Sequence, residues 1–194
     1  MALLEVLKFP DPRLRHKGQM VEKITPELQE LAQDMLETMK SQNGVGLAAI
    51  QVAQPVRLLT ADTSSELSDP SEENSRYSTS ELKKDLVAHI KQPLILFNPE
   101  VIKKEGQVIF PEGCLSFPSY FAKIKRAEIV EVKALNEEGQ EVLIKTDGLL
   151  SICLQHEIDH LDGKLFIDHL SPIKSQRLKE EIKKNGYPDK SATA

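Results

Sequence analysis

The sequence has 194 residues, the size of one ordinary domain, and 40% of them are hydrophobic, enough for a core that folds without disulfides. Its 25 basic and 30 acidic residues give a formal charge of −5, which argues against a nucleic-acid binder that neutralises phosphates. Two cysteines make no disulfide framework, and no apolar run has the length of a membrane span, so the composition favours a cytoplasmic enzyme.

A helix is the first element that the sequence predicts. Thr25 can cap it, Pro26 suits its first turn, and apolar residues recur at helical spacing over residues 25–42. Residues 44–52, GVGLAAIQV, follow as a glycine-flanked loop of small side chains, and residues 56–61 are typical of a strand.

The middle of the chain combines a polar insertion with short apolar runs. Residues 62–92 are serine-rich and nearly free of large apolar side chains, which predicts a mobile surface insertion with a short helix near residues 80–90. Apolar runs at residues 94–102, 107–110 and 115–117 then indicate strands.

The last third of the chain begins with a predicted hairpin and continues into two helices. Residues 128–135 and 141–146 flank a turn that contains Gly139. A very apolar helix covers residues 149–161, and a charged helix covers residues 172–184. Strands outnumber long helices and short turns join them, so the fold class is antiparallel α+β.

The segment CLQHEIDHLDGKLF, residues 153–166, holds the strongest chemical signal. His156 and His160 are four residues apart, so on a helix both imidazoles lie on one face, about 6 Å apart, and can bind one ion. Glu157 lies about 100° around the helix, where it can take a proton from water. Burial of these polar groups in so apolar a helix is costly unless they bind a metal, which favours a metal site over a chance match.

Several residues compete to be the third metal ligand. The protease pattern H-E-x-x-H-x-x-G-x-x-H is met at Gly163, but its last position is Phe166, which cannot bind a metal. His169 comes three residues too late for that pattern. Glu180 offers a carboxylate, but its helix has the composition of an ordinary charged surface element.

The two cysteines differ in their fitness for the site. Cys153 is seven residues from His160, about 10 Å along the helix axis, which is too far for one ion that also binds His156, so it is expected in the core. Cys114 follows a predicted strand and Gly113, and a thiolate with two imidazoles leaves a fourth position open, as in catalytic sites; an isolated nucleophile is the alternative. The other histidines are expected to be ordinary surface or core residues: His16, His89 and His169.

Three segments together resemble the signature motifs of peptide deformylases, in the same order and without a gap: GVGLAAIQ (44–51), EGCLS (112–116) and QHEIDHLDG (155–163). The resemblance covers most of the chain outside the insertion. It implies antiparallel sheets packed around a central metal-binding helix, with an N-terminal and a C-terminal helix. It also implies one catalytic domain over residues 1–186, followed by a flexible tail at residues 187–194.

The resemblance implies a metal-dependent hydrolase that removes the formyl group from the initiator methionine of nascent peptides. Glu157 would be the catalytic acid and base, while the Gln51 side-chain amide and the Leu115 N–H would stabilise the oxyanion. One divalent ion per chain is implied, with Fe(II) as the usual native metal and Zn, Ni or Co able to replace it. Its ligands would be Cys114, His156 and His160.

The loop at Gly44 and the strand end at residues 110–113 are expected to flank a cleft in which a peptide adds as an extra strand. The residues expected at the substrate are Gly44, Val45, Gly46, Phe110, Glu112, Gly113, Leu149 and Ile152. Plain core packing is the alternative for the last two. The expected partners are N-formylmethionyl nascent peptides at the ribosome, with neither DNA nor membrane, and the chain is expected to be a monomer.

Two other functions stay open. An endopeptidase is disfavoured by the missing third histidine and by the presence of Cys114. A non-enzymatic, metal-binding or ribosome-associated module is disfavoured by Glu157, Gln51 and an open ligand position, none of which a purely structural metal site needs.

Overall fold

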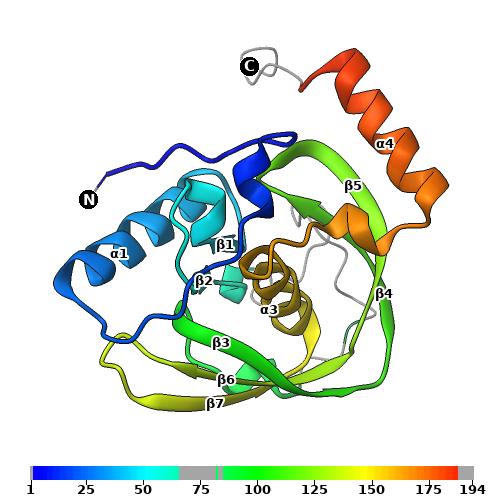
Figure 1. The fold of residues 1–194 in the computed structure, drawn as a ribbon. Coiled ribbons are helices and arrows are strands. Elements are labelled where there is room, and N and C mark those ends of the chain that lie inside the picture. The colour runs from blue at the N-terminus through cyan, green and yellow to red at the C-terminus, as the bar shows by residue number, and fades with distance from the viewer. Residues whose placement is uncertain (1, 66–81, 83–84, 188–194) are drawn as a thin grey trace.

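The computed structural model of the chain describes residues 2–65, 82 and 85–187. Five strands form one sheet in the order β1-β2-β3-β6-β7, and β4 and β5 form a second sheet (Figure 1). Every neighbouring pair is antiparallel, which confirms the predicted α+β class. The strands are β1 Gly46–Ala48, β2 Leu58–Ala61, β3 Leu94–Glu105, β4 Val108–Cys114, β5 Phe117–Arg126, β6 Ile129–Leu135 and β7 Glu141–Thr146.

Helix α3, Gly148–Leu161, lies at the centre of the molecule, with the large sheet on one side and β4 and β5 on another (Figure 1). All of its residues are buried except Asp159. Side chains such as Leu150 and Leu154 pack with residues of β2, β3 and β6 in one hydrophobic cluster. A helix that is apolar on all faces belongs in a core, so its composition explains its central place.

Two further helices lie toward the two ends of the chain. Helix α1, Pro26–Ser41, packs Met35 and Met39 against β1 and β2, as its apolar face predicted. Helix α4, Pro172–Asn185, projects from the body of the protein beyond β5 (Figure 1). Short 3-10 helices connect the longer elements: η1 Pro12–Arg15, η2 Ala49–Val52, η3 Val87–His89 and η4 Phe166–His169.

Two predicted segments are more regular than the sequence indicated. The loop expected at residues 44–52 contains β1, which forms an edge of the large sheet, and η2 follows it directly. The run at residues 107–110 marks the beginning of β4, whereas in the run at residues 115–117 the first two residues form the turn and only Phe117 belongs to β5. The two strands pair along their length. In β5, exposed residues such as Lys125 alternate with buried ones such as Ile124, so a search for continuous apolar runs finds only its start.

Both ends of the polar insertion are held by the body of the protein. Val87 is buried, and its N–H donates a hydrogen bond of 2.9 Å to the Asp147 carboxylate. The Gln92 side chain accepts a hydrogen bond of 2.7 Å from the Thr63 N–H. The short helix expected near residues 80–90 corresponds to η3, while most of the segment predicted to be mobile lies outside the described residues.

The predicted flexible tail begins with a residue that packs on the body of the protein. The ring of Tyr187 meets Tyr120 edge-on, with centroids 5.9 Å apart, and its hydroxyl donates to the Phe9 carbonyl at 2.8 Å. Contacts of this kind stabilise an aromatic ring. The sequence contained no sign of them, because Tyr187 follows the last predicted helix. Residues 188–194 lie outside the described part of the chain. No described helix has both the length and the apolar character needed to cross a membrane.

Candidate active site

Cys114, His156 and His160 bring their ligand atoms into one cluster. Cys114 ends β4, and the two histidines lie on one face of α3. His160 Nε2 lies 3.3 Å from Cys114 Sγ and 3.2 Å from His156 Nε2, and the three ligand atoms all lie within 4.8 Å of one another. Ligands that bind one tetrahedral ion at about 2.0–2.3 Å lie about 3.3–3.7 Å apart, so the cluster has the size of a metal site.

The hydrogen bonding of the two histidines also fits a cation. Their Nε2 atoms lie 3.2 Å apart, so without an ion one of them can hold a proton and donate it to the other. His160 Nδ1 is buried and has no hydrogen-bond partner among the described residues. One divalent ion could bind both Nε2 lone pairs together with Cys114 Sγ, so the residues present fit a metal held by one thiolate and two imidazoles.

The two histidines differ in their electrostatic surroundings. Burial alone would lower the pKa of His156, but the Cys114 thiolate and the hydrogen bonds to Cys114 and Glu112 outweigh it and raise the pKa well above its usual value. Burial and the adjacent charge of His156 lower the pKa of His160 well below its usual value. A metal binds imidazoles in the neutral form, so an ion at this site would displace the proton that these surroundings favour on His156.

A buried network of charged residues contacts His156 at Nδ1, the ring nitrogen outside the ligand cluster. Glu112 Oε2 lies 2.8 Å from His156 Nδ1, and the same carboxylate accepts two hydrogen bonds from Arg126, at 2.6 and 2.9 Å. Arg126 also donates to Asp159 at 2.5 Å, and His169 Nε2 lies 2.7 Å from the same Asp159 oxygen. A carboxylate bonded to the second ring nitrogen fixes the tautomer and the orientation of a ligand histidine, and Glu112 is that partner for His156.

Most of this network could not be predicted from the sequence. Glu112 was expected at the substrate; it lines the cavity, and its buried carboxylate also bonds to Arg126 and His156. Asp159 offered one signal, since Glu157 and Asp159 are the only charges on an otherwise apolar helix. Arg126 could not be recognised as a functional residue, because it lies in a strand in which charged residues alternate with others. His169 contacts the same Asp159 as Arg126, and its place in the sequence alone did not indicate a role.

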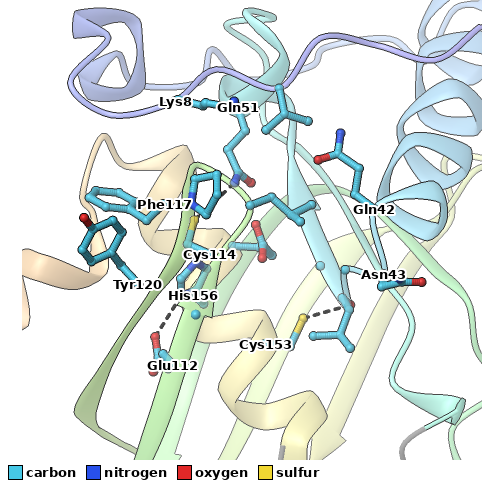
Figure 2. Close-up of a pocket in the computed structure, with 18 of the residues that line it drawn as sticks. Lys8, Gln42, Asn43, Gln51, Glu112, Cys114, Phe117, Tyr120, Cys153 and His156 are labelled. Carbon is cyan, nitrogen blue, oxygen red and sulfur yellow. Dashed lines mark hydrogen bonds and ion pairs between the residues drawn. The ribbon is translucent and has the colours of Figure 1, made fainter. Parts of the chain in front are cut away.

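Glu157 lies close to β1, within the core. Burial raises the pKa of its carboxyl to about 7, and its Oε2 has no hydrogen-bond partner among the described residues. A Cβ on Gly46 would collide with this carboxylate and would lie 2.6 Å from Cys153 Sγ, so only glycine lets β1 pass this closely. Cys153 is outside the metal cluster, as expected, and its Sγ lies 3.3 Å from the Val45 carbonyl (Figure 2).

The side-chain amide of Gln51 is held at both ends. Its Oε1 accepts from the Ala48 N–H at 2.8 Å, and its Nε2 donates to Ser116 Oγ at 3.1 Å. The same nitrogen lies 3.5 Å from Cys114 Sγ. Figure 2 shows the Gln51 side chain pointing toward Cys114. Leu115 lines the same cavity. The two groups predicted to stabilise an oxyanion therefore lie beside the metal cluster.

A cavity of about 890 Å³ contains the predicted substrate residues. Two edge strands border it, β1 of the large sheet and β4 of the small one, so main-chain groups are available to an extended peptide. The lining includes Gly44, Val45, Gly46, Phe110, Glu112, Gly113, Leu149 and Ile152. Phe110, Leu149 and Ile152 also form a small buried cluster, so they are at once pocket wall and core.

The three motif segments thus meet in one cavity, although they lie far apart in the sequence. The family described as polypeptide deformylase matches residues 3–176. The chain belongs to that family. This membership agrees with the resemblance found in the sequence, and it includes each segment that contributes to the cavity.

Relatives of known name cover nearly the whole chain. A peptide deformylase of Pseudoalteromonas translucida is 46% identical over 95% of this chain and 96% of its own, and one of Tolumonas auensis is 45% identical over the same shares. The crystal structure of a peptide deformylase from Legionella pneumophila has a TM-score of 0.76 and 38% identity, covering 94% of this chain and 95% of that one. The crystal structure of a peptide deformylase from Ehrlichia chaffeensis in complex with actinonin has a TM-score of 0.78 and 35% identity, covering 97% of this chain and 100% of that one.

Proposed function

We propose that this chain is a metal-dependent hydrolase that removes the N-formyl group from the initiator methionine of nascent polypeptides and releases formate. The observation that carries this proposal is that Glu157 and Gln51 line one cavity together with two members of the Cys/His/His cluster, Cys114 and His156. A proton acceptor, an oxyanion donor and a site for an electrophilic ion are the parts that amide hydrolysis needs.

The metal ligands in this proposal are Cys114, His156 and His160. The ion that they would hold supplies Lewis-acid chemistry at the formyl group. Glu112 would keep His156 in the orientation that points Nε2 into the cluster, since it is hydrogen-bonded to Nδ1. Arg126 in turn fixes Glu112 through two hydrogen bonds.

Three side-chain and backbone groups would carry out the proton and charge movements. Glu157 takes a proton from the attacking water, and its burial, which raises the pKa of its carboxyl, suits a group that must accept and then return a proton. As the water oxygen attacks the formyl carbon, the Gln51 amide and the Leu115 N–H donate to the formyl oxygen, each contributing about 3 kcal/mol. Glu157 then gives its proton to the leaving amine, and formate departs.

The substrate would bind as an extended chain along β1 and β4, through main-chain hydrogen bonds. Its methionine side chain would contact Phe110, Leu149 and Ile152, which form an apolar wall of the cavity. Main-chain recognition would make binding depend only weakly on the residues after methionine. Within the cell, the enzyme would act as a cytoplasmic monomer on nascent chains at the ribosome.

Fe(II) is the native ion in this proposal. A thiolate and two imidazoles suit Fe(II), Zn, Co and Ni alike, and zinc binds more tightly, so a recombinant sample can carry the wrong metal. Because thiolate-bound iron is open to oxidation, the iron form should lose activity in air, while a zinc or nickel form should not. Activity and metal content followed for hours under air and under nitrogen would test this; an iron form that stays fully active in air contradicts it.

The direct test of the function is formate release from formyl-Met-Ala-Ser by protein purified without oxygen, with its metal content assayed. Acetyl-Met-Ala-Ser serves as the matched control, because it differs only in the acyl group. Rapid release of formate with one ion per chain, and no release of acetate, would support the proposal. No release by fully loaded protein would exclude it, and cleavage of casein at internal bonds would favour the endopeptidase instead.

A further inference from the structure

Tyr187 joins the end of helix α4 to the wall of the active site. Its hydroxyl donates to the Phe9 carbonyl at 2.8 Å and lies 3.4 Å from the Ser116 carbonyl. Its ring meets that of Tyr120 edge-on, and Lys8 Nζ lies 5.9 Å above it. The Tyr120 hydroxyl donates back to the Gly186 carbonyl at 3.2 Å, so the chain end is attached at two points.

The backbone that Tyr187 touches belongs to the oxyanion side of the site. The Phe9 N–H donates to the Ser116 carbonyl at 2.9 Å, and the Leu7 N–H donates to the Gln51 carbonyl at 2.7 Å. The Ser116 hydroxyl also accepts from Gln51 Nε2. Residues 7–9 therefore bridge the two segments that carry the oxyanion donors, and the Tyr187 hydroxyl lies at the junction of that bridge with Ser116.

We propose that Tyr187 is a positioning residue for the hydrolysis: its hydroxyl fixes the Phe9–Ser116 junction and thereby holds the Leu115 N–H and the Gln51 amide at the spacing that an oxyanion requires. This inference rests on the proposed function, because it assigns a role within that same site. Oxyanion donors must be placed before charge develops, so a small loosening of their backbone lowers the rate more than it lowers binding.

The surroundings of Tyr187 suit a permanent hydrogen-bond donor. Burial raises the pKa of its hydroxyl to about 12, and the nearby charges of Cys114 and Tyr120 act in the same direction. The hydroxyl therefore stays protonated at any pH at which the enzyme would work.

The test compares Tyr187→Phe with the parent enzyme, both loaded with the same metal. Phenylalanine keeps the ring contacts with Tyr120 and Lys8 and removes only the hydroxyl. We expect kcat for formyl-Met-Ala-Ser to fall about three- to tenfold, as for the loss of one hydrogen bond, with KM changed less than about twofold. Amide exchange of the peptide that contains Phe9 should become faster, because its N–H bonds to Ser116.

Two shortened chains provide a matched control that does not depend on the phenylalanine variant. A chain that ends at Tyr187 should keep the parent kcat. A chain that ends at Asn185 lacks Tyr187, so its kcat should fall to the level of a Tyr187→Ala variant. All comparisons are made below the melting temperature of each variant, per metal-loaded chain.

The outcomes separate this inference from the proposed function. If Tyr187→Phe and the chain ending at Asn185 both keep the parent kcat, Tyr187 only anchors the helix and the inference is overturned, even if the melting temperature falls. If KM rises while kcat stays constant, the residue acts on substrate binding, which also overturns it. If the parent itself releases no formate, the proposed function fails before the variants are compared.

Discussion

Two buried glutamates near the metal cluster have opposite electrostatic surroundings. Burial opposes the ionisation of Glu112, but hydrogen bonds from Arg126 and His156 outweigh it and lower its pKa. For Glu157, burial prevails and raises the pKa to about 7. When two carboxyl groups have different pKa values because of their surroundings, they can take different roles. Glu112 stays ionised and orients a ligand, whereas Glu157 can gain and lose a proton.

Replacement of Glu157 by glutamine should separate catalysis from metal binding. The variant keeps the shape of the side chain but cannot accept a proton, so kcat/KM should fall about 10²- to 10⁴-fold. Its metal content should stay at the parent value, because Glu157 is not among the three ligand residues. Formate release and metal analysis on the same sample check this, and near-full activity would rule out the role assigned to Glu157.

The rate should also depend on pH through Glu157. The pKa of about 7 belongs to the protein without its ion, and a cation beside the carboxylate favours its charged form, so the pKa of the loaded enzyme should lie below 7. Because a base must be deprotonated, kcat/KM should decline as the pH falls through that value. A profile from about pH 5 to about pH 8 tests this; a flat profile, with the metal shown to remain bound, would contradict it.

At the scale of elements, the close approach of β1 to α3 places Glu157. Gly46→Ala should push the Glu157 carboxylate or the strand aside, since the new Cβ would also lie 2.6 Å from Cys153 Sγ. We expect kcat/KM to fall at least about 100-fold, as for a displaced catalytic group, with the metal retained. The control is Gly139→Ala in the β6-β7 turn, which costs about 1 kcal/mol of stability at its positive φ of 77° and should keep full activity. Equal activity of the two variants would contradict the account.

The sequence predicted the elements whose signals are local and left out those that depend on distant partners. Helix α3 and its ligand pair follow from apolar composition and a four-residue spacing. Strand β5 is amphipathic and charged, so its length depends on pairing with β4. Arg126 acquires its role only when folding brings it to Glu112 and Asp159, which lie 14 and 33 residues away in the chain. No local residue pattern predicts contacts between residues so far apart in the sequence.

At the scale of the whole molecule, Arg126 and its two carboxylates tie β4, β5 and α3 together. Burial opposes the ionisation of Asp159, but hydrogen bonds and charge from His169 and Arg126 outweigh it and hold its pKa below the usual 3.8. The folded chain therefore binds fewer protons than the unfolded chain at this group. Its stabilising effect is present above about pH 4 and is lost as the pH falls below that value.

Asp159→Asn should accordingly lower the free energy of unfolding at pH 7 by about 2 kcal/mol, with a smaller difference near pH 2. Urea unfolding of metal-free protein at both pH values measures this without the effect of acid on metal binding. The control, Asp162→Asn, removes the partly exposed partner of Arg57 and should cost less than about 1 kcal/mol. Equal losses at both pH values would contradict the assignment.

The central position of α3 makes the ion a ligand of the folded state alone. His156 and His160 are core residues, so unfolding the core separates them from Cys114 and releases the metal. At an ion concentration a hundredfold above the Kd, binding adds about 2.7 kcal/mol to the stability of the native chain. A preparation with less than one ion per chain contains loaded and empty molecules of different stability, so it should melt in two steps, and brief heating between them would precipitate the empty molecules and leave a solution enriched in loaded enzyme.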